Sequence, residues 1–287
     1  MSAQRVALVT GCGKPDGMGQ AIARTLAAQG LAVVVTDLHA TGVPNRQQED
    51  RSADWGGVEA LVAGITATGG TAASALGDVA VEADAQRMVA EAVERFGRLD
   101  VLVNNAAAPQ GPDRADVADI PVEVFDRVIA VNLRGPWLMS SAAVPVMRAQ
   151  RSGRIVNISS MAGLTAAPFS GPYSASKAGV IGLTRALAMD LGPWGITVNA
   201  LCPGLVGTSR AFLSSGPDVD EAALLASRGR NIPVGRVGLP DDIAAAVAFL
   251  ASPGAGYITG QAIPIDGGGM SPFPLRHPEP AAEAAVS

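Results

Sequence analysis

The amino-acid sequence predicts an α/β protein: a single domain built on a doubly wound parallel sheet of about seven strands, with helices on both faces. Three observations support this fold class. Short runs of β-branched residues alternate with longer amphipathic runs along the 287 residues. The strand-like runs are apolar throughout, which is typical of strands buried on both faces. A glycine-rich turn joins the first strand-like run to the first helical run.

Each expected strand is a run of small or β-branched apolar residues bounded by glycine or polar residues. In chain order, the strands are expected at Val6–Val9, Ala32–Thr36, Ala73–Leu76, Val101–Val103, Arg154–Ile158, Thr197–Leu201 and Ala262–Ile265.

Each expected helix is a longer run with apolar residues three or four positions apart. The helices are expected at Gly19–Gln29, Gly57–Ala67, Ala83–Phe96, Val122–Arg148, Tyr173–Leu191 and Asp241–Ala251. The last one has a clear start at Leu239-Pro240-Asp241-Asp242, because acidic groups stabilise the positive end of the helix dipole.

One domain is expected over residues 1–270, because no linker and no internal repeat interrupts this alternation. Thr41–Asp54 is polar and aperiodic, and is predicted to form a long loop after the second strand. Residues 271–287 contain Pro, Ala and Glu and are predicted to form a loosely held C-terminal tail.

The composition excludes several functions. Two cysteines, Cys12 and Cys202, cannot supply a zinc cluster or a disulfide framework, and they suit a reduced compartment. His39 and His277 lie in polar or Pro-rich segments that suit no hydrolase base. A net charge of −5 argues against nucleic acid or an anionic membrane as the partner. Without a recognisable targeting or spanning segment, a cytoplasmic location is expected.

The glycine-rich turn runs from Thr10 to Gly19 and contains Gly11, Gly13 and Gly17. Glycines allow close approach to a pyrophosphate, and a helix N-terminus offers free amides and partial positive charge. Ordinary tight turns use the same residues, but the position between strand and helix favours dinucleotide binding.

Asp37 ends the second strand, 26 residues after Gly11. An acid here can accept hydrogen bonds from the adenosine ribose and would repel a 2′-phosphate. It could instead be a surface acid, and Lys14 in the glycine turn could attract a 2′-phosphate. The sequence therefore favours NAD as the cofactor and leaves NADP open.

Tyr173 and Lys177 are four residues apart, which places both side chains on one side of a helix. A neighbouring ammonium favours the phenolate form of a phenol, so the pair can exchange protons near neutral pH. The chain has only two lysines, Lys14 and Lys177, which makes a chance match uncommon. The alternative is an amphipathic helix with a solvated lysine.

Over roughly residues 5–270 the chain resembles the short-chain dehydrogenase/reductase family, whose members have a Rossmann fold. Beside the glycine turn and Tyr173-Ser174-Ala175-Ser176-Lys177, the resemblance rests on Asn104-Asn105-Ala106-Ala107, Val131-Asn132-Leu133, Ile158-Ser159-Ser160, Pro203-Gly204-Leu205-Val206-Gly207-Thr208, Ile258-Thr259-Gly260-Gln261 and Asp266-Gly267-Gly268. Ser160 lies 13 residues before Tyr173 and 28 after Asn132, which is the family's spacing.

The resemblance implies four catalytic residues. Tyr173 would be the general acid–base, Lys177 would favour its phenolate and bind the nicotinamide ribose, and Ser160 would hydrogen-bond the reacting oxygen. Asn132 would hold a water that links Lys177 to solvent. Ser159 is the competing serine, but strand alternation directs it to the opposite face. The implied cofactor contacts are Gly11, Gly17, Met18, Gly19, Asp37, Asp78, Val79, Asn105, Ala106, Tyr173, Lys177, Pro203, Gly204, Val206 and Thr208.

Three departures from the family pattern stand out. The glycine loop is two residues longer than the family's, so the positions of residues 14–16 stay open. Ala107 replaces a glycine and adds a methyl group near the nicotinamide side. The Thr41–Asp54 loop exceeds the usual length; it either folds over the adenosine or is a plain surface insertion, which the sequence favours.

The function predicted from these residues is hydride transfer between NAD(H) and a secondary alcohol or ketone, an activity on CH–OH groups that needs no metal. One alternative is an NADPH-dependent 3-oxoacyl-thioester reductase, which Asp37 opposes. A family enoyl reductase would place its Lys six residues after Tyr, unlike this chain. A non-enzymatic dinucleotide-binding scaffold is also possible in principle, but such proteins tend to lose the Ser, Tyr or Lys.

The predicted substrate pocket comprises Ala108–Gln110, Met161–Phe169 and Leu205–Leu213, with a lid over about 205–237. Arg210 is the only charge in those three segments, so an uncharged, moderately hydrophobic carbonyl is expected. Arg210 could instead bind a carboxylate, although a solvated arginine is favoured. By resemblance, Val122–Arg148 and Tyr173–Leu191 would form the interface of a homotetramer.

Overall fold

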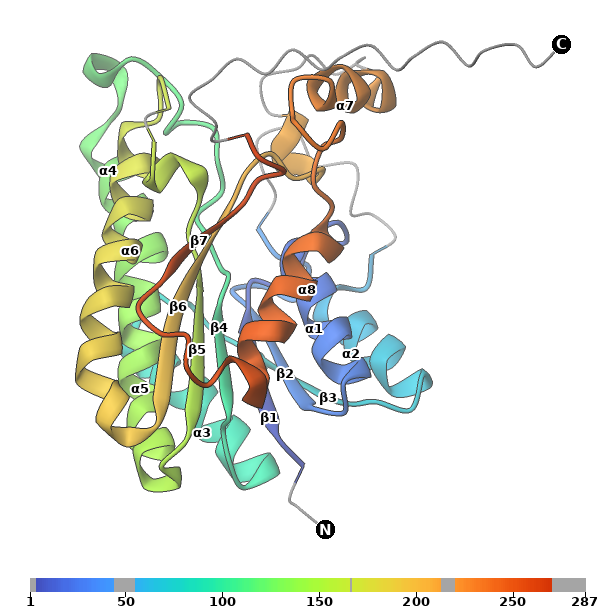
Figure 1. Ribbon diagram of the computed structural model, residues 1–287, viewed down its shortest axis with the longest axis vertical. Helices are drawn as coiled ribbons and strands as arrows, with labels where there is room; N and C mark the ends of the chain where they lie inside the picture. The colour runs from blue at the N-terminus through green and yellow to red at the C-terminus, as the bar shows by residue number, and fades with distance from the viewer. Residues whose placement is uncertain (1–3, 44–54, 166, 213–219, 270–287) are drawn as a thin grey trace, which may run out of the picture.

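The computed structural model describes residues 4–43, 55–165, 167–212 and 220–269. Its centre is one parallel sheet with the strand order β3-β2-β1-β4-β5-β6-β7 (Figure 1). The strands are β1 (Val6–Thr10), β2 (Ala32–Asp37), β3 (Thr71–Leu76), β4 (Val101–Asn104), β5 (Gly153–Ile158), β6 (Ile196–Pro203) and β7 (Ala262–Ile265). The predicted seven-stranded parallel sheet is therefore confirmed.

Helices cover both faces of the sheet, as predicted (Figure 1). One face carries α1 (Met18–Ala28), α2 (Gly57–Ala67) and α8 (Pro240–Ala251), and the other carries α3 (Glu82–Phe96), α4 (Val122–Ile129), α5 (Gly135–Gln150) and α6 (Gly171–Leu191). Strand side chains alternate between the two layers: Val33 and Val35 pack toward α1 and α8, whereas Val34 packs toward α3. The unbroken apolar runs reflect this double burial.

Two helical features differ from the prediction. The expected helix Val122–Arg148 is divided by a π-helical segment, η2 (Ala130–Arg134), between α4 and α5. A π segment keeps the chain helical, so the apolar periodicity does not reveal it. The helix α7 (Glu221–Gly229), whose N-cap is Asp220, was not predicted.

The chain crosses from one half of the sheet to the other between β3 and β4, so β1 and β4 are neighbours although they are distant in sequence. In such sheets the loops after these two strands diverge and leave a crevice at the carboxyl ends. Gly11 follows β1 and Asn105 follows β4, so both lie at this crevice.

The predicted tail at residues 271–287 and most of the loop Thr41–Asp54 lie outside the described residues, as do residues 213–219 of the predicted lid. Within the described part of the chain, no helix combines the length and apolar character needed to span a bilayer.

Candidate active site

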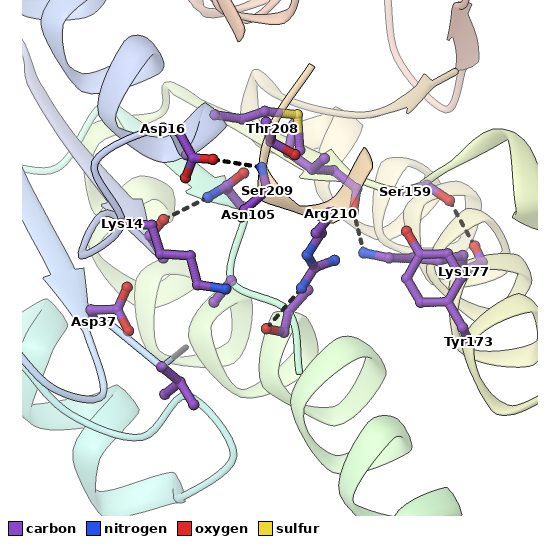
Figure 2. Close-up of a pocket in the computed structure, with 17 residues that line it drawn as sticks. Lys14, Asp16, Asp37, Asn105, Ser159, Tyr173, Lys177, Thr208, Ser209 and Arg210 are labelled. Carbon is purple, nitrogen blue, oxygen red and sulfur yellow. Dashed lines mark hydrogen bonds between the residues drawn. The ribbon is translucent and has the colours of Figure 1, made fainter. Parts of the chain in front are cut away.

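A cavity, here called the main cavity, opens at the carboxyl ends of the strands beside β1 and β4 (Figure 2). Its lining comes from six regions of the chain: Gly11, Lys14, Asp16, Gly17, Met18, Asp37, Val43, Asn105, Ala106, Ala107, Ile158, Ser159, Tyr173, Lys177, Thr208, Ser209 and Arg210. The fold thus brings the glycine turn, Asp37 and the Tyr173–Lys177 pair to one cavity.

The glycine turn packs against the loop after β4 without room for side chains. Gly11 has a φ of +75°, and a Cβ there would lie 2.7 Å from the Cα of Ala106. A Cβ on Gly19 would lie 2.3 Å from the carbonyl oxygen of Gly11. Gly17, which precedes α1, provides no side-chain cap, so within the described parts of the chain the amides at this helix N-terminus are left for an anion in the cavity.

Asn105 fastens the glycine turn to β4. Its Nδ2 donates to the carbonyl oxygens of Thr10 at 2.8 Å and Gly11 at 3.0 Å. The Thr10 hydroxyl in turn accepts from the backbone N–H groups of Asn105 and Ala106, each at 3.0 Å. The sequence analysis did not single out Thr10, because nothing in its spacing distinguishes it from any strand-end threonine.

Asp37 and Lys14 lie together at one end of the main cavity. The Asp37 carboxylate accepts from the backbone N–H of Gly13 and of Leu38, both at 2.8 Å, and burial raises its pKa. Burial and the charge of Arg210 lower the pKa of Lys14 to about 8, although Asp16 and Asp37 act in the opposite direction. This end of the cavity therefore holds a fixed carboxylate beside a buried amine.

A smaller side cavity continues from the main cavity and shares Gly11, Asp37 and Ala106 with it. Asp78 and Val79, two of the predicted contacts, line this extension. Arg127 of α4 closes it by pairing with Asp78 at 3.1 Å.

The Tyr173–Lys177 pair lies on α6 at the other end of the main cavity (Figure 2). Lys177 is 3% exposed, its Nζ donates to the carbonyl of Ile158 at 2.8 Å, and it lies 5.7 Å from the centre of the Tyr173 ring. Burial, and then the charge of Arg210, lower the pKa of Lys177 to about 7. The alternative of a solvated lysine on an amphipathic helix is excluded by this burial.

The two serines after β5 occupy different positions. The hydroxyl of Ser159 is buried and donates to the backbone carbonyl of Lys177 at 2.8 Å, which ties β5 to α6. Ser160 is half-buried, and its hydroxyl accepts from the backbone N–H of Ala162 at 3.1 Å. Ser159, and not Ser160, belongs to the cavity lining.

Asn132 lies in the π-helical segment η2 and is fully buried. Its side-chain oxygen accepts from the N–H of Ala108 at 2.8 Å, and its Nδ2 donates to the hydroxyl of Ser176 at 3.1 Å. Asn132 thus connects the loop after β4 to α6. Because both ends of this side-chain amide are hydrogen-bonded to the protein, a water held at Asn132 would have to bind to its backbone.

The segment after β6 contributes only partly to the main cavity. Thr208 lines it, whereas Pro203, Gly204 and Val206 lie outside its lining. Gly204 is placed against β7, where a Cβ would lie 2.8 Å from the Cβ of Asp266. The sequence analysis missed Asp16 and Ser209, which meet here through a 2.5 Å hydrogen bond from the Ser209 N–H to Asp16 Oδ2.

A second, outer cleft of about 540 Å³ adjoins the main cavity through Arg210. It is lined by Gln110, Gly111, Arg114, Ala115, Pro168, Phe169, Leu205, Arg210, Ala211 and Arg228. Arg210 is the only charge in the three predicted pocket segments, and this cleft adds Arg114 and Arg228 from outside them. Arg114 precedes Arg210 by a long stretch of sequence, and Arg228 lies beyond the loop that holds Arg210. Sequence spacing therefore does not predict that the three side chains line one cleft.

A family model described as enoyl-(acyl carrier protein) reductase matches residues 11–270. An uncharacterized oxidoreductase of Thermotoga maritima is 40% identical over 92% of this chain and 96% of its own length. The 3-oxoacyl-[acyl-carrier-protein] reductase of Synechocystis is 38% identical, with 92% and 96% covered. A solved actinorhodin polyketide ketoreductase with NADPH superposes with a TM-score of 0.80 at 35% identity, with 93% and 97% covered.

Proposed function

The chain belongs to the short-chain dehydrogenase/reductase family of oxidoreductases, and from this premise we propose that it interconverts a secondary alcohol and a ketone with NAD(H). The observation that carries the proposal is the single cavity shared by Asp37, the free N-terminus of α1 and the buried Tyr173–Lys177 pair. One end fits a dinucleotide, and the other end carries groups that exchange a proton.

The lining residues fit a dinucleotide in the close approach of their backbone and in their free amides. The close packing of Gly11 and Gly19 brings backbone close to the ligand, and the uncapped amides of α1 suit a pyrophosphate. Asp16 Oδ1 is buried without a partner among the described residues, which is typical of a group that awaits a ligand or water. When bound, NAD(H) would supply or accept the hydride.

The protein's own groups would then manage the proton and the charge on oxygen. Tyr173 would give its phenolic proton to the carbonyl oxygen during reduction and take it back during oxidation. Lys177 would favour the phenolate and hold the nicotinamide ribose. Ser160 would donate a hydrogen bond to the reacting oxygen, because its hydroxyl accepts from the Ala162 N–H and keeps its own proton to donate. A water held at the backbone of Asn132 would return protons to Lys177.

The spacing of Tyr173 and Lys177 supports reduction at a carbonyl over reduction at an enoyl double bond, although the family model carries the enoyl reductase description. The rigid Asp37 carboxylate supports NAD over NADP, because a 2′-phosphate beside it would be repelled.

A second candidate is an NADPH-dependent 3-oxoacyl-thioester reductase. Two relatives favour it: the Synechocystis reductase by its name and the actinorhodin ketoreductase by its NADPH. Lys14 at the Asp37 end of the cavity is the group in this chain that would accept the 2′-phosphate. Initial rates with NADH and NADPH separate the two candidates.

We also propose a cytoplasmic homotetramer assembled through α4, α5 and α6. Large side chains stand exposed on these helices, among them Phe125, Trp137 and Met189, the last of which is 71% exposed. Monomeric proteins seldom expose such groups together.

Replacing Tyr173 with Phe tests the proposed function. Loss of the phenolic proton is expected to lower kcat by about 100-fold or more on any ketone that the wild type reduces, while NADH binding stays within about twofold. Tyr257→Phe is the matched control, because Tyr257 is fully exposed on the surface. Wild-type turnover in Tyr173→Phe would refute the role of this residue.

A further inference from the structure

The outer cleft combines a cationic wall with an apolar wall. Among the described residues that line it there are three arginines and no carboxylate. Phe169, Leu205 and Pro168 supply its larger apolar side chains. A cleft of this composition suits a different ligand from the uncharged, moderately hydrophobic carbonyl that the sequence predicted.

Two of the arginines, Arg210 and Arg228, donate to backbone carbonyls. Arg210 is half-buried, and its NH2 group donates to the carbonyls of Ala108 at 2.8 Å and Ala107 at 3.3 Å. A guanidinium has five N–H donors, and these contacts use only those of one nitrogen. Arg228 donates to the carbonyl of Ala211. A carbonyl orients a guanidinium without cancelling its charge, so Arg210 keeps its positive charge at the cleft.

Arg114 extends the positive charge of the cleft to Tyr173, the proposed proton donor. Its guanidinium lies 5.0 Å from the centre of the Tyr173 ring. Asp113 is the acid that faces it, but the separation is 3.9 Å, and the other oxygen of Asp113 accepts from the N–H of Gly111. The cationic wall therefore begins beside Tyr173 and continues to Arg228.

Phe169 lies on the apolar side of the cleft and has an unusual backbone conformation. It is a non-glycine residue with a φ of +51°, and its side chain is 64% exposed. A bulky side chain in the left-handed region is strained, and such strain concentrates at ligand-binding segments.

We propose that the substrate carries an anionic oxygen group, carboxylate or phosphate, which is bound in the outer cleft by Arg210 and Arg228 with Arg114 beside them, while an apolar part packs on Phe169 and Leu205. The inference rests on the proposed function, because the carbonyl of such a substrate must lie at Tyr173. Charge-assisted hydrogen bonds from a guanidinium suit both anions.

Arg210 could serve the cofactor phosphates instead, since it also lines the main cavity (Figure 2). Arg228 separates the two roles, because it lines the outer cleft and is not part of the main-cavity lining. Arg228→Gln is therefore the diagnostic variant. Arg230→Gln is the matched control, since Arg230 is two residues away, exposed and outside both linings.

The experiment measures calorimetric binding and turnover of three probes by the NAD(H)-loaded protein: benzoylpropionate, its methyl ester and its coenzyme A thioester. We expect benzoylpropionate or the thioester to bind at least about 10-fold more tightly than the ester in the wild type and in Arg230→Gln. In Arg228→Gln the ratio of these affinities should fall toward one. A preference for the acid assigns a carboxylate, and a preference for the thioester alone assigns a phosphate.

Two results would overturn the inference: equal binding of all three probes by the wild type, or an unchanged preference in a folded Arg228→Gln protein. If that variant fails to fold, Arg114→Gln, at an exposed residue, replaces it with the same expectation. Tight, Arg228-dependent binding without turnover of any probe by either NADH or NADPH would instead contradict the proposed function and leave the anion site standing.

Discussion

Replacing Lys177 with Met is expected to stabilise the protein below neutral pH while abolishing its activity. The ammonium is buried in the main cavity, and its pKa falls from an ordinary 10.5 to about 7. The unfolded chain thus binds a proton more readily than the folded one between these two values, so burial of the charge opposes folding. Methionine has a similar length and carries no charge.

The size of the effect follows from this difference. A pKa that falls from 10.5 to about 7 corresponds to at most about 5 kcal/mol at pH values below both. Methionine leaves the Ile158 carbonyl without its 2.8 Å donor, which costs about 2 kcal/mol. The net gain is about 3 kcal/mol, or about 5 °C in Tm for a chain of this length.

The difference in stability between Lys177→Met and the wild type changes sign with pH. The wild type gains stability as pH rises from about 7 toward 10.5, because the unfolded state then holds the extra proton. The advantage of Lys177→Met should therefore be full at pH 6, fall to zero at about pH 9 and reverse above it, where only the loss of the bond to Ile158 remains. Thermal unfolding of the cofactor-free proteins at pH values between these limits measures it.

Tyr173→Phe is the control, because it alters the same cavity and keeps the buried ammonium. It should follow the pH dependence of the wild type. A Lys177→Met protein that is less stable than the wild type at pH 6, or whose advantage does not change with pH, would refute the argument from burial.

Two further predictions concern the serines and the cofactor. Ser160→Ala should lower kcat by about 100-fold, as for the loss of one donor to a reacting oxygen, whereas Ser159→Ala should mainly lower Tm by removing the bond to the Lys177 carbonyl. If steady-state kinetics instead showed the large loss of kcat in Ser159→Ala and not in Ser160→Ala, Ser159 would be the serine that contacts the reacting oxygen. Asp37→Ser should lower the NADH-to-NADPH ratio of kcat/KM by about 10-fold or more, and Lys14→Ala should raise it. An unchanged ratio in both variants would show that neither residue selects the cofactor.

The sequence predicted the sheet well because its strands are buried on both faces. The run at Ala32–Thr36 consists almost wholly of β-branched and small residues, and the structure extends that strand by one residue to Asp37. The pair Tyr173 and Lys177 was also recognisable, since lysine is rare in this chain and helix geometry alone places the two side chains together.

Other features depend on contacts that no local pattern encodes. The π segment at Ala130–Arg134 changes the hydrogen-bond register by one residue, which a helical periodicity tolerates. The cationic outer cleft joins Arg114 to Arg228 across more than a hundred residues of sequence. They meet only because the loop after β4, which holds Arg114, lies against α7, which holds Arg228, and no local sequence pattern predicts that contact.

Arg210 connects the destabilised lysine to the proposed anion site. Its positive charge contributes, after burial, to the low pKa of Lys177, and it lines both the main cavity and the outer cleft. An anion bound at Arg210 would offset that charge and so raise the pKa of Lys177, which favours the ammonium form that the Tyr173 phenolate needs. A neutral substrate would leave the lysine partly deprotonated at neutral pH. Anion binding in the outer cleft would therefore do more than hold the substrate: it would place Lys177 in its active protonation state when the substrate is present.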